Sequence, residues 1–316
     1  FAGAIFATGL VAQERPDDFP NRPLNIVVMY PAGGGMDVTA RTFAQVAEEK
    51  MGVEMRVENR VGGGGMVGHI GMAKETDPDG YSIALVANPF LYTDIILRDA
   101  PFTIDDFEPL AGVNFDPVVL TVNANSEIGD MSMDEILEHA QDNTLQAGIN
   151  PNSVFQFVME FVQSTRDVEF NFIPFDGGKQ GVVSLLAGDI DITSAFYSEI
   201  AQYTESGDLR AVAVSGDDRH PLMPDVPTLM ELGVPVGGQA WGVSRLFTLP
   251  PGTPEDRRAW LEAEFLEAME SPEMEEAFTN AGLLLQPLPE DETKEQFVVS
   301  FDALRDFLVE TGRISQ

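Results

Sequence analysis

Two glycine-rich segments hold the residues of this chain that are best suited to binding a small anion. The first, Pro31–Asp37 (PAGGGMD), follows an apolar run of strand length and leads into a segment with helical spacing. Glycine lets a ligand approach backbone N–H groups, and a helix N-terminus carries about half a positive charge. The segment therefore predicts an anion site that needs no basic side chain. Asp37, at the junction of loop and helix, is either the N-cap or a ligand contact.

The second glycine-rich segment, Gly63–Gly68, matches the G-x-G-x-x-G pattern of dinucleotide-binding loops. That function requires an acidic residue about 20 positions further on to bind the ribose hydroxyls. The next predicted strand ends in Asn88 instead, and the pattern follows the second predicted strand rather than the first. A structural turn that packs a helix closely is therefore the favoured interpretation.

Residues typical of catalysis are sparse. The three histidines (69, 139 and 220) stand apart from one another, there is no cysteine, and neither a G-x-S-x-G nucleophile motif nor a P-loop lysine is present. We therefore predict no catalytic residue, no metal site and no cofactor, and expect a binding protein. An α/β enzyme that uses the glycine-rich loops to bind a nucleotide or a phosphorylated substrate is the alternative.

Charge and length narrow the class of protein further. The 316 residues contain 18 Lys and Arg against 52 Asp and Glu, a formal net charge of −34. Nucleic acids and anionic membrane surfaces require a basic footprint, so we expect neither as a partner. At roughly 100–200 residues per domain, the length favours two domains.

The elements that would position the glycine-rich loops alternate between strand and helix. Three predicted strands (24–30, 55–59 and 82–88) enclose two helices (37–51 and 67–74), an order typical of a parallel sheet covered on both faces. After a linker-like stretch the alternation resumes, with strands at 117–123, 145–150, 170–175, 190–195 and 210–215 and helices at 133–141, 154–163 and 180–187. Three acidic amphipathic helices follow, at 254–269, 272–281 and 290–310.

This order predicts two doubly wound α/β domains, the last helices returning to support the first. We assign residues 19–120 to the first part of domain 1, 121–246 to domain 2 and 247–316 to the return. Residues 1–18 are interpreted as a signal-peptide remnant and N-terminal extension, with cleavage near Ala12, because an apolar run with small residues precedes a polar stretch. An ordinary N-terminal helix is the alternative. We expect an exported, periplasmic protein.

Several motifs, in order along the chain, resemble those of the solute-binding proteins of tripartite tricarboxylate transporters, the Bug-type receptors. They include YPAGGGMDVTAR (30–41), GVEMRVENRVGGGGMVGHIGMAK (52–74), PDGYSIAL (78–85) and LRAVAVSGDDRHPLMPDVPTLMELG (209–233). The resemblance implies a Venus-flytrap of the periplasmic binding protein type, with two domains joined by a hinge and a small carboxylate in the cleft. It also implies a monomer that delivers this ligand to the membrane components of the transporter.

In such receptors one loop from each domain closes on the ligand, and here these loops correspond to residues 32–37 and 150–155. Arg245 is a candidate partner for a distal carboxylate, since its position near Trp241 resembles a Trp-Arg-Gly segment of some relatives. The ligand-binding residues implied by the resemblance are Tyr30, Ala32, Gly33, Gly34, Gly35, Met36, Asp37, Asn88, Asn150, Asn152, Ser153, Val154, Phe155, Phe175, Ala195, Phe196 and Arg245.

The second loop departs from the family pattern in ways that concern the ligand. Pro151 removes an N–H donor, Val154 and Phe155 stand where serine is common, and Ala195 stands where an acidic residue is common. We therefore expect a ligand with an apolar middle, such as a medium-chain or aromatic dicarboxylate. Burial of Phe155 in the core of its own helix is the alternative. The hinge is expected near residues 120–121 and 245–247.

Overall fold

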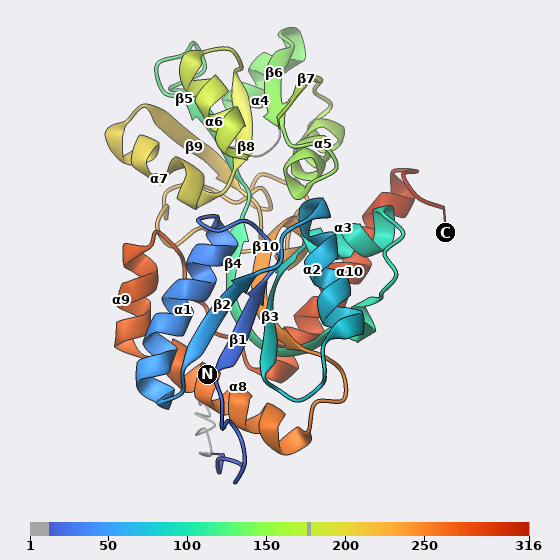
Figure 1. The fold of residues 1–316 in the computed structure, drawn as a ribbon. Coiled ribbons are helices and arrows are strands. Elements are labelled where there is room, and N and C mark those ends of the chain that lie inside the picture. Colours follow the sequence, from blue (N-terminus) through green and yellow to red (C-terminus); the bar gives the residue numbers. More distant parts are fainter. Residues whose placement is uncertain (1–12, 176–177, 316) are drawn as a thin grey trace, which may run out of the picture.

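The chain forms two α/β domains, drawn one above the other in Figure 1, in a computed structural model that describes residues 13–175 and 178–315. Each domain is built on a five-stranded sheet. The segment interpreted as a signal-peptide remnant falls largely on residues 1–12, outside the described residues. No helix in the described ranges has the length and apolar character needed to cross a membrane.

The first sheet has the strand order β2-β1-β3-β10-β4. Its strands are β1 (Leu24–Val28), β2 (Met55–Asn59), β3 (Ser82–Asn88), β4 (Glu108–Pro117) and β10 (Gly242–Leu249). Strand β1 pairs in parallel with β2 and β3, whereas β10 lies antiparallel to both β3 and β4. The sheet is therefore mixed rather than wholly parallel, because β10 re-enters this domain from the second one.

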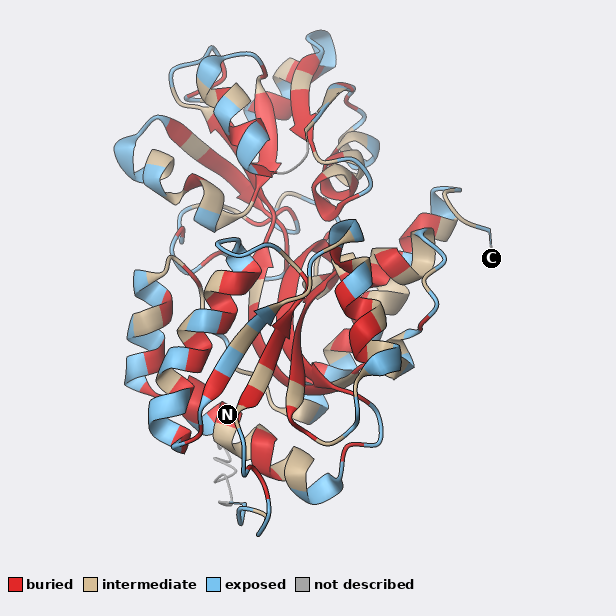
Figure 2. Cartoon of the chain, viewed as in Figure 1, coloured by how far each residue is buried: buried red, intermediate tan, exposed pale blue. Residues whose placement is uncertain are grey.

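Both faces of the first sheet are covered, so its central strands are apolar throughout. Ile26 and Val28 of β1 belong to one core cluster, which includes Phe43 and Phe265, and Val27 belongs to another. Figure 2 shows the central strands buried along most of their length. The helices on one face are α1 (Gly35–Met51), α8 (Glu255–Met269) and α9 (Pro272–Asn280), and those on the other are α2 (Met66–Ile70), α3 (Phe90–Leu97) and α10 (Glu290–Glu310).

The second sheet repeats this plan with the order β7-β6-β8-β5-β9. Strand β6 is parallel to β7 and β8, and β5 is antiparallel to β8 and β9. Helix α4 begins with a capping box in which Glu135 N–H donates to the Ser132 hydroxyl. The elements are β5 (Val119–Asn123), α4 (Met133–Asp142), β6 (Leu145–Ile149), α5 (Val154–Arg166), β7 (Phe170–Pro174), α6 (Gly178–Ala187), β8 (Ile192–Ala195), α7 (Tyr197–Ser206) and β9 (Leu209–Val214).

The stretch that resembled a linker in the sequence contains α3 and β4, and the return strand β10 was also missed. All eight residues of β10 are buried, but Ser244, Arg245 and Thr248 interrupt its apolar pattern. Because β10 begins at Gly242, the chain returns to the first sheet earlier than residue 247. The expected hinge positions lie inside β5 and β10, and the chain crosses between the sheets at residue 118 and within 215–241.

Candidate ligand-binding site

The first glycine-rich loop ends at the N-terminus of α1, at the edge of the first domain that faces the second (Figure 1). Helix α1 starts at Gly35, two positions before the predicted start, and Gly34 is its N-cap. Val38 N–H donates to the Gly34 carbonyl at 2.9 Å. The N–H groups of Gly35, Met36 and Asp37 precede this first intrahelical bond and form the positive end of a 17-residue helix.

Asp37 is not the N-cap of α1, and its carboxylate is bound within the loop. Its carboxylate accepts hydrogen bonds from Gly33 N–H (2.9 Å), Arg41 Nε (2.9 Å) and Asn59 Nδ2 (2.9 Å). Burial raises the pKa of Asp37, but these three donors outweigh it and lower the pKa to about 2. Asp37 therefore fixes the loop, in which Gly33 has a φ of +79° that favours glycine.

Arg245, on β10, lies beside this loop. A Cβ atom added at Gly35 would be 3.6 Å from Arg245 Nη2. The guanidinium is 5% exposed; Nη1 donates to Asn114 Oδ1 at 3.1 Å, and Nη2 lies 3.5 Å from Asp116 Oδ2. The guanidinium therefore lies next to the N-terminus of α1, with Asp116 as its acidic neighbour.

Asn88 shares a small cavity with Arg245. Asn88 ends β3 and is buried, and neither its Oδ1 atom nor Arg245 Nε has a hydrogen-bond partner among the described residues. Both residues line a cavity of about 20 Å³ together with Asn114 and Ser244. A cavity of this size can hold one water molecule that bridges such groups.

Tyr30 extends from the first loop to the second glycine-rich segment. A Cβ added at Gly65 would lie 3.2 Å from the Tyr30 hydroxyl. Burial raises the pKa of this hydroxyl well above its usual value. His69 is buried beside it, with Nδ1 2.8 Å from Asp94 Oδ2. A Cβ at Gly68 would lie 2.8 Å from the Arg60 carbonyl oxygen. The second segment is therefore the close-packed structural turn that the sequence favoured.

The second predicted loop, before α5, has a defined conformation of its own. The Ser153 hydroxyl donates to the Asn150 carbonyl at 2.7 Å, and Asn152 has a φ of +55°. Val154 is fully buried in the core, and Phe155 is 4% exposed with its ring 4.6 Å from that of Phe196. The alternative interpretation of Phe155, as a core residue of its helix, therefore agrees with this packing.

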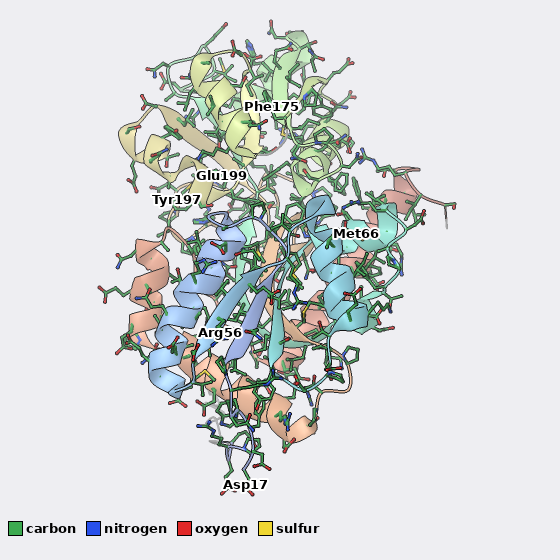
Figure 3. The ribbon with its side chains drawn as sticks, in the orientation of Figure 1. Asp17, Arg56, Met66, Phe175, Tyr197 and Glu199 are labelled. Atoms are coloured by element: carbon green, nitrogen blue, oxygen red, sulfur yellow. The ribbon has the colours of Figure 1, made fainter. Side chains whose placement is uncertain are left out.

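The segment after β8 lies at the junction of the domains. Phe196 is half-buried and packs against the first-domain core cluster that contains Phe43 and against the cluster that extends through both domains and contains Phe155, whereas Ala195 is fully buried. Tyr197 N–H donates to Asp116, and Figure 3 shows Tyr197 and Glu199 on the side of the second domain that faces the first. Burial raises the pKa of Asp116, and the attraction of Arg245 only partly offsets this.

Three groups in this region were missed by sequence reasoning: Asn114, Asp116 and Glu199. Burial raises the pKa of Glu199 although its carboxylate accepts from Phe196 N–H at 3.0 Å. The sequence offers one indication of this group: Asp116 is a charged residue at the end of a strand that is otherwise mostly buried. Phe175 lines a cavity along α6, which Glu199 also lines. Within the described ranges, no cluster of three or more His, Asp or Glu side chains is arranged to hold a metal.

The structure thus has two α/β domains joined by crossing segments, with the N-terminus of α1 at the edge of the first domain that faces the second. Residues 39–300 match the family described as the tripartite tricarboxylate transporter family receptor. The chain is 30% identical over 273 residues to a UPF0065 protein of Bordetella pertussis (84% of this chain, 82% of that protein). It is 29% identical over 289 residues to BugT from the same organism (89% and 86%). The chain belongs to this receptor family.

Solved structures show the same architecture. A TctC solute-binding protein from Polaromonas has a TM-score of 0.77 at 27% identity, covering 91% of this chain and 99% of that one. The R. palustris protein Rpa4515 with adipate has a TM-score of 0.77 at 21% identity (93% and 99%). MatC from Rhodopseudomonas palustris with bound malate has a TM-score of 0.69 at 22% identity (90% and 100%). The Venus-flytrap fold and the assignment to a receptor family rather than an enzyme are thus confirmed.

Proposed function

We propose that this chain is a periplasmic receptor that binds a small carboxylate between its domains and delivers it to the membrane components of a tripartite tricarboxylate transporter. The observation that carries the proposal is the position of Arg245 Nη2 beside Gly35 at the N-terminus of α1. A carboxylate placed there receives the free N–H groups of the helix and a charged donor. Hydrogen bonds to charged groups contribute about 1.5–3 kcal/mol each, so three or four support micromolar binding, about 8 kcal/mol.

The net charge of −34 does not oppose this function. At physiological salt the Debye length is about 8 Å, so most of the field of distant carboxylates is screened. Asp116 offsets part of the Arg245 charge locally, at 3.5 Å. The negative charge of Asp116 reduces the desolvation penalty of burying the Arg245 guanidinium. The helix N–H groups supply the rest of the attraction for a carboxylate ligand.

For the ligand itself, we propose a carboxylate with an apolar middle, a medium-chain or aromatic dicarboxylate. The half-buried ring of Phe196, backed by Phe155, offers an apolar surface at the domain junction. Burying three CH₂ groups there contributes about 2.4 kcal/mol, roughly fiftyfold in affinity. Adipate, bound to one structural neighbour, has an apolar middle of four CH₂ groups, whereas malate, bound to another, has a shorter middle that carries a hydroxyl group.

Calorimetric titration with citrate, malate, adipate and terephthalate tests the proposal. We expect adipate or terephthalate to bind most tightly; tightest binding of citrate or malate would contradict the apolar middle while leaving the receptor function intact. No binding by any of the four, together with a nucleotide that co-purifies with the protein in native mass spectrometry, would overturn the receptor function.

A glycine variant locates the anion. Gly35→Ala places a methyl group 3.6 Å from Arg245 Nη2, an ordinary contact distance, so the fold is retained while the space for the carboxylate is filled. Gly71→Ala is the matched control, since a Cβ there would lie 3.6 Å from Arg60 Nη1. We expect at least a tenfold loss of affinity in the first variant and no change in the second. Equal affinity in both variants would place the carboxylate elsewhere.

We also propose export through an N-terminal signal peptide and a monomeric state. Export is tested by determining the N-terminus of the mature protein from a periplasmic fraction. The monomer is tested by light scattering with and without adipate.

A further inference from the structure

The last helix of the first domain reaches the second domain. Helix α10 packs on β4, but the segment after it contacts α5 of the other domain. The Arg313 guanidinium pairs with the Glu160 carboxylate of α5, with Nη2 2.6 Å from Oε2. The rings of Phe307 and Phe161 are stacked at 4.6 Å, and Arg313 lies 4.9 Å from the centre of the Phe157 ring. Helix α5 thus rests on the end of α10.

The direction of Arg313 is set by the way α10 ends. Gly312 has a φ of +69°, a left-handed conformation that favours glycine and turns the chain out of the helix. Arg313 N–H then donates to the Leu308 carbonyl at 2.9 Å. These two features hold the side chain against α5, with both Arg313 and Glu160 less than a quarter exposed.

From Glu160, hydrogen bonds continue along one face of α5 to the second ligand loop. Gln156 Nε2 donates to Glu160 Oε1 at 2.7 Å, and Asn152 N–H donates to Gln156 Oε1 at 2.8 Å. Gln156 and Glu160 are four residues apart and share a face of α5, and Asn152 precedes this helix in the loop. An ionised carboxylate only accepts, so Glu160 forces the Gln156 amide to present its oxygen to Asn152.

We propose that Arg313 is a positioning residue for ligand binding. It holds Glu160, Glu160 orients Gln156, and Gln156 holds the Asn152 N–H and with it the left-handed turn of the loop at residues 150–153. Because Arg313 follows α10 of the first domain and Glu160 lies in the second, the conformation of this loop depends on how the domains are oriented. The inference rests on the proposed function, in which that loop is one of the two that contact the ligand.

Hydrogen–deuterium exchange of the ligand-free protein tests the chain of contacts without a ligand. We expect Arg313→Ala to speed the exchange of peptides that cover residues 150–156 at least threefold, and Arg313→Lys to have a smaller effect because lysine keeps the charge but not the planar guanidinium, whose Nη2 contacts both oxygens of Glu160. Arg305→Ala is the matched control, since Arg305 on α10 pairs only with Asp302 and Asp306 of its own helix among the described residues. A peptide that covers β1 reports any general loss of stability.

Titration of the same variants with adipate completes the test. We expect an affinity at least threefold weaker for Arg313→Ala, partial recovery for Arg313→Lys, and no change for Arg305→Ala. Unchanged exchange of residues 150–156 in Arg313→Ala, with β1 also unchanged, would overturn the inference, as would faster exchange with unchanged affinity. If Arg313→Ala does not fold, Glu160→Gln is used, which keeps the size of the side chain and removes its charge. Failure of the wild-type protein to bind any carboxylate would refute the proposed function instead. The exchange experiment would still show whether the contacts from Arg313 to Asn152 order the loop.

Discussion

Replacing Asp37 by asparagine removes the charge that organises the first loop. The pKa of Asp37 is about 2, against an ordinary value of 3.8. At about 1.4 kcal/mol per pH unit, this difference corresponds to about 2 kcal/mol in favour of the ionised, folded state. Asparagine can accept one of the existing bonds, but its NH₂ group would face donors from Arg41 or Asn59. We therefore expect the variant to lose about 2 kcal/mol of unfolding free energy at pH 7.

The loss of stability in Asp37→Asn should depend on pH in a direction that the lowered pKa of Asp37 determines. A carboxyl whose pKa is lowered by folding stabilises the folded state above its unfolded pKa, and the contribution disappears as the pH falls towards the folded value. The difference between wild type and Asp37→Asn should thus be full above about pH 5 and shrink between about pH 4 and pH 2. Urea unfolding followed by tryptophan fluorescence measures it at each pH.

Asp17→Asn is the control for Asp37→Asn. Asp17 is an exposed aspartate at the far end of the first domain, as Figure 3 shows, and we expect no loss of stability from this variant. If Asp37→Asn unfolds at the same urea concentration as wild type at pH 7, the hydrogen bonds to Asp37 contribute nothing net and the reasoning is wrong. A loss that is equally large at pH 2.5 would also refute it, because the charge would then not be its source.

Three further predictions concern the site and the motion of the domains. Gly34→Val brings a branched side chain into the first loop, with its Cβ 3.3 Å from the Pro31 carbonyl oxygen; calorimetry should show at least a tenfold loss of affinity, and an unchanged affinity would mean that the loop does not hold the anion. Glu199→Gln should raise the melting temperature at pH 8 but not at pH 4, because burial raises the pKa of Glu199 and its charge therefore destabilises the folded state only at higher pH; an equal change at both values would contradict this. Saturating ligand should reduce the radius of gyration in small-angle scattering, through rotation about residue 118 and residues 215–241, and an identical profile at full occupancy would argue against closure.

Local patterns in the sequence determined much of the first binding loop and of the fold. The alternation of apolar runs with helical spacing predicted β1, α1, β2 and β3, because continuous burial and a 3.6-residue period leave direct marks on residue order. The glycines at 33–35 predicted the free helix N-terminus for a similar reason, since backbone conformation is a property of a few adjacent residues. The signals for α4, α5 and the three C-terminal helices were equally local.

Only the tertiary structure decided which charged groups meet at the site. Arg245 and Asn114 are 131 residues apart, and the position of Arg245 became visible only when β10 was placed between β3 and β4. The sequence showed an arginine in an interrupted apolar run, because the partners that allow a charge to be buried come from neighbouring strands. The same holds for Arg313 and Glu160, 153 residues apart in different domains. Strand order and the contact between domains depend on how surfaces formed by residues far apart in the sequence pack together. A local sequence pattern does not contain that information.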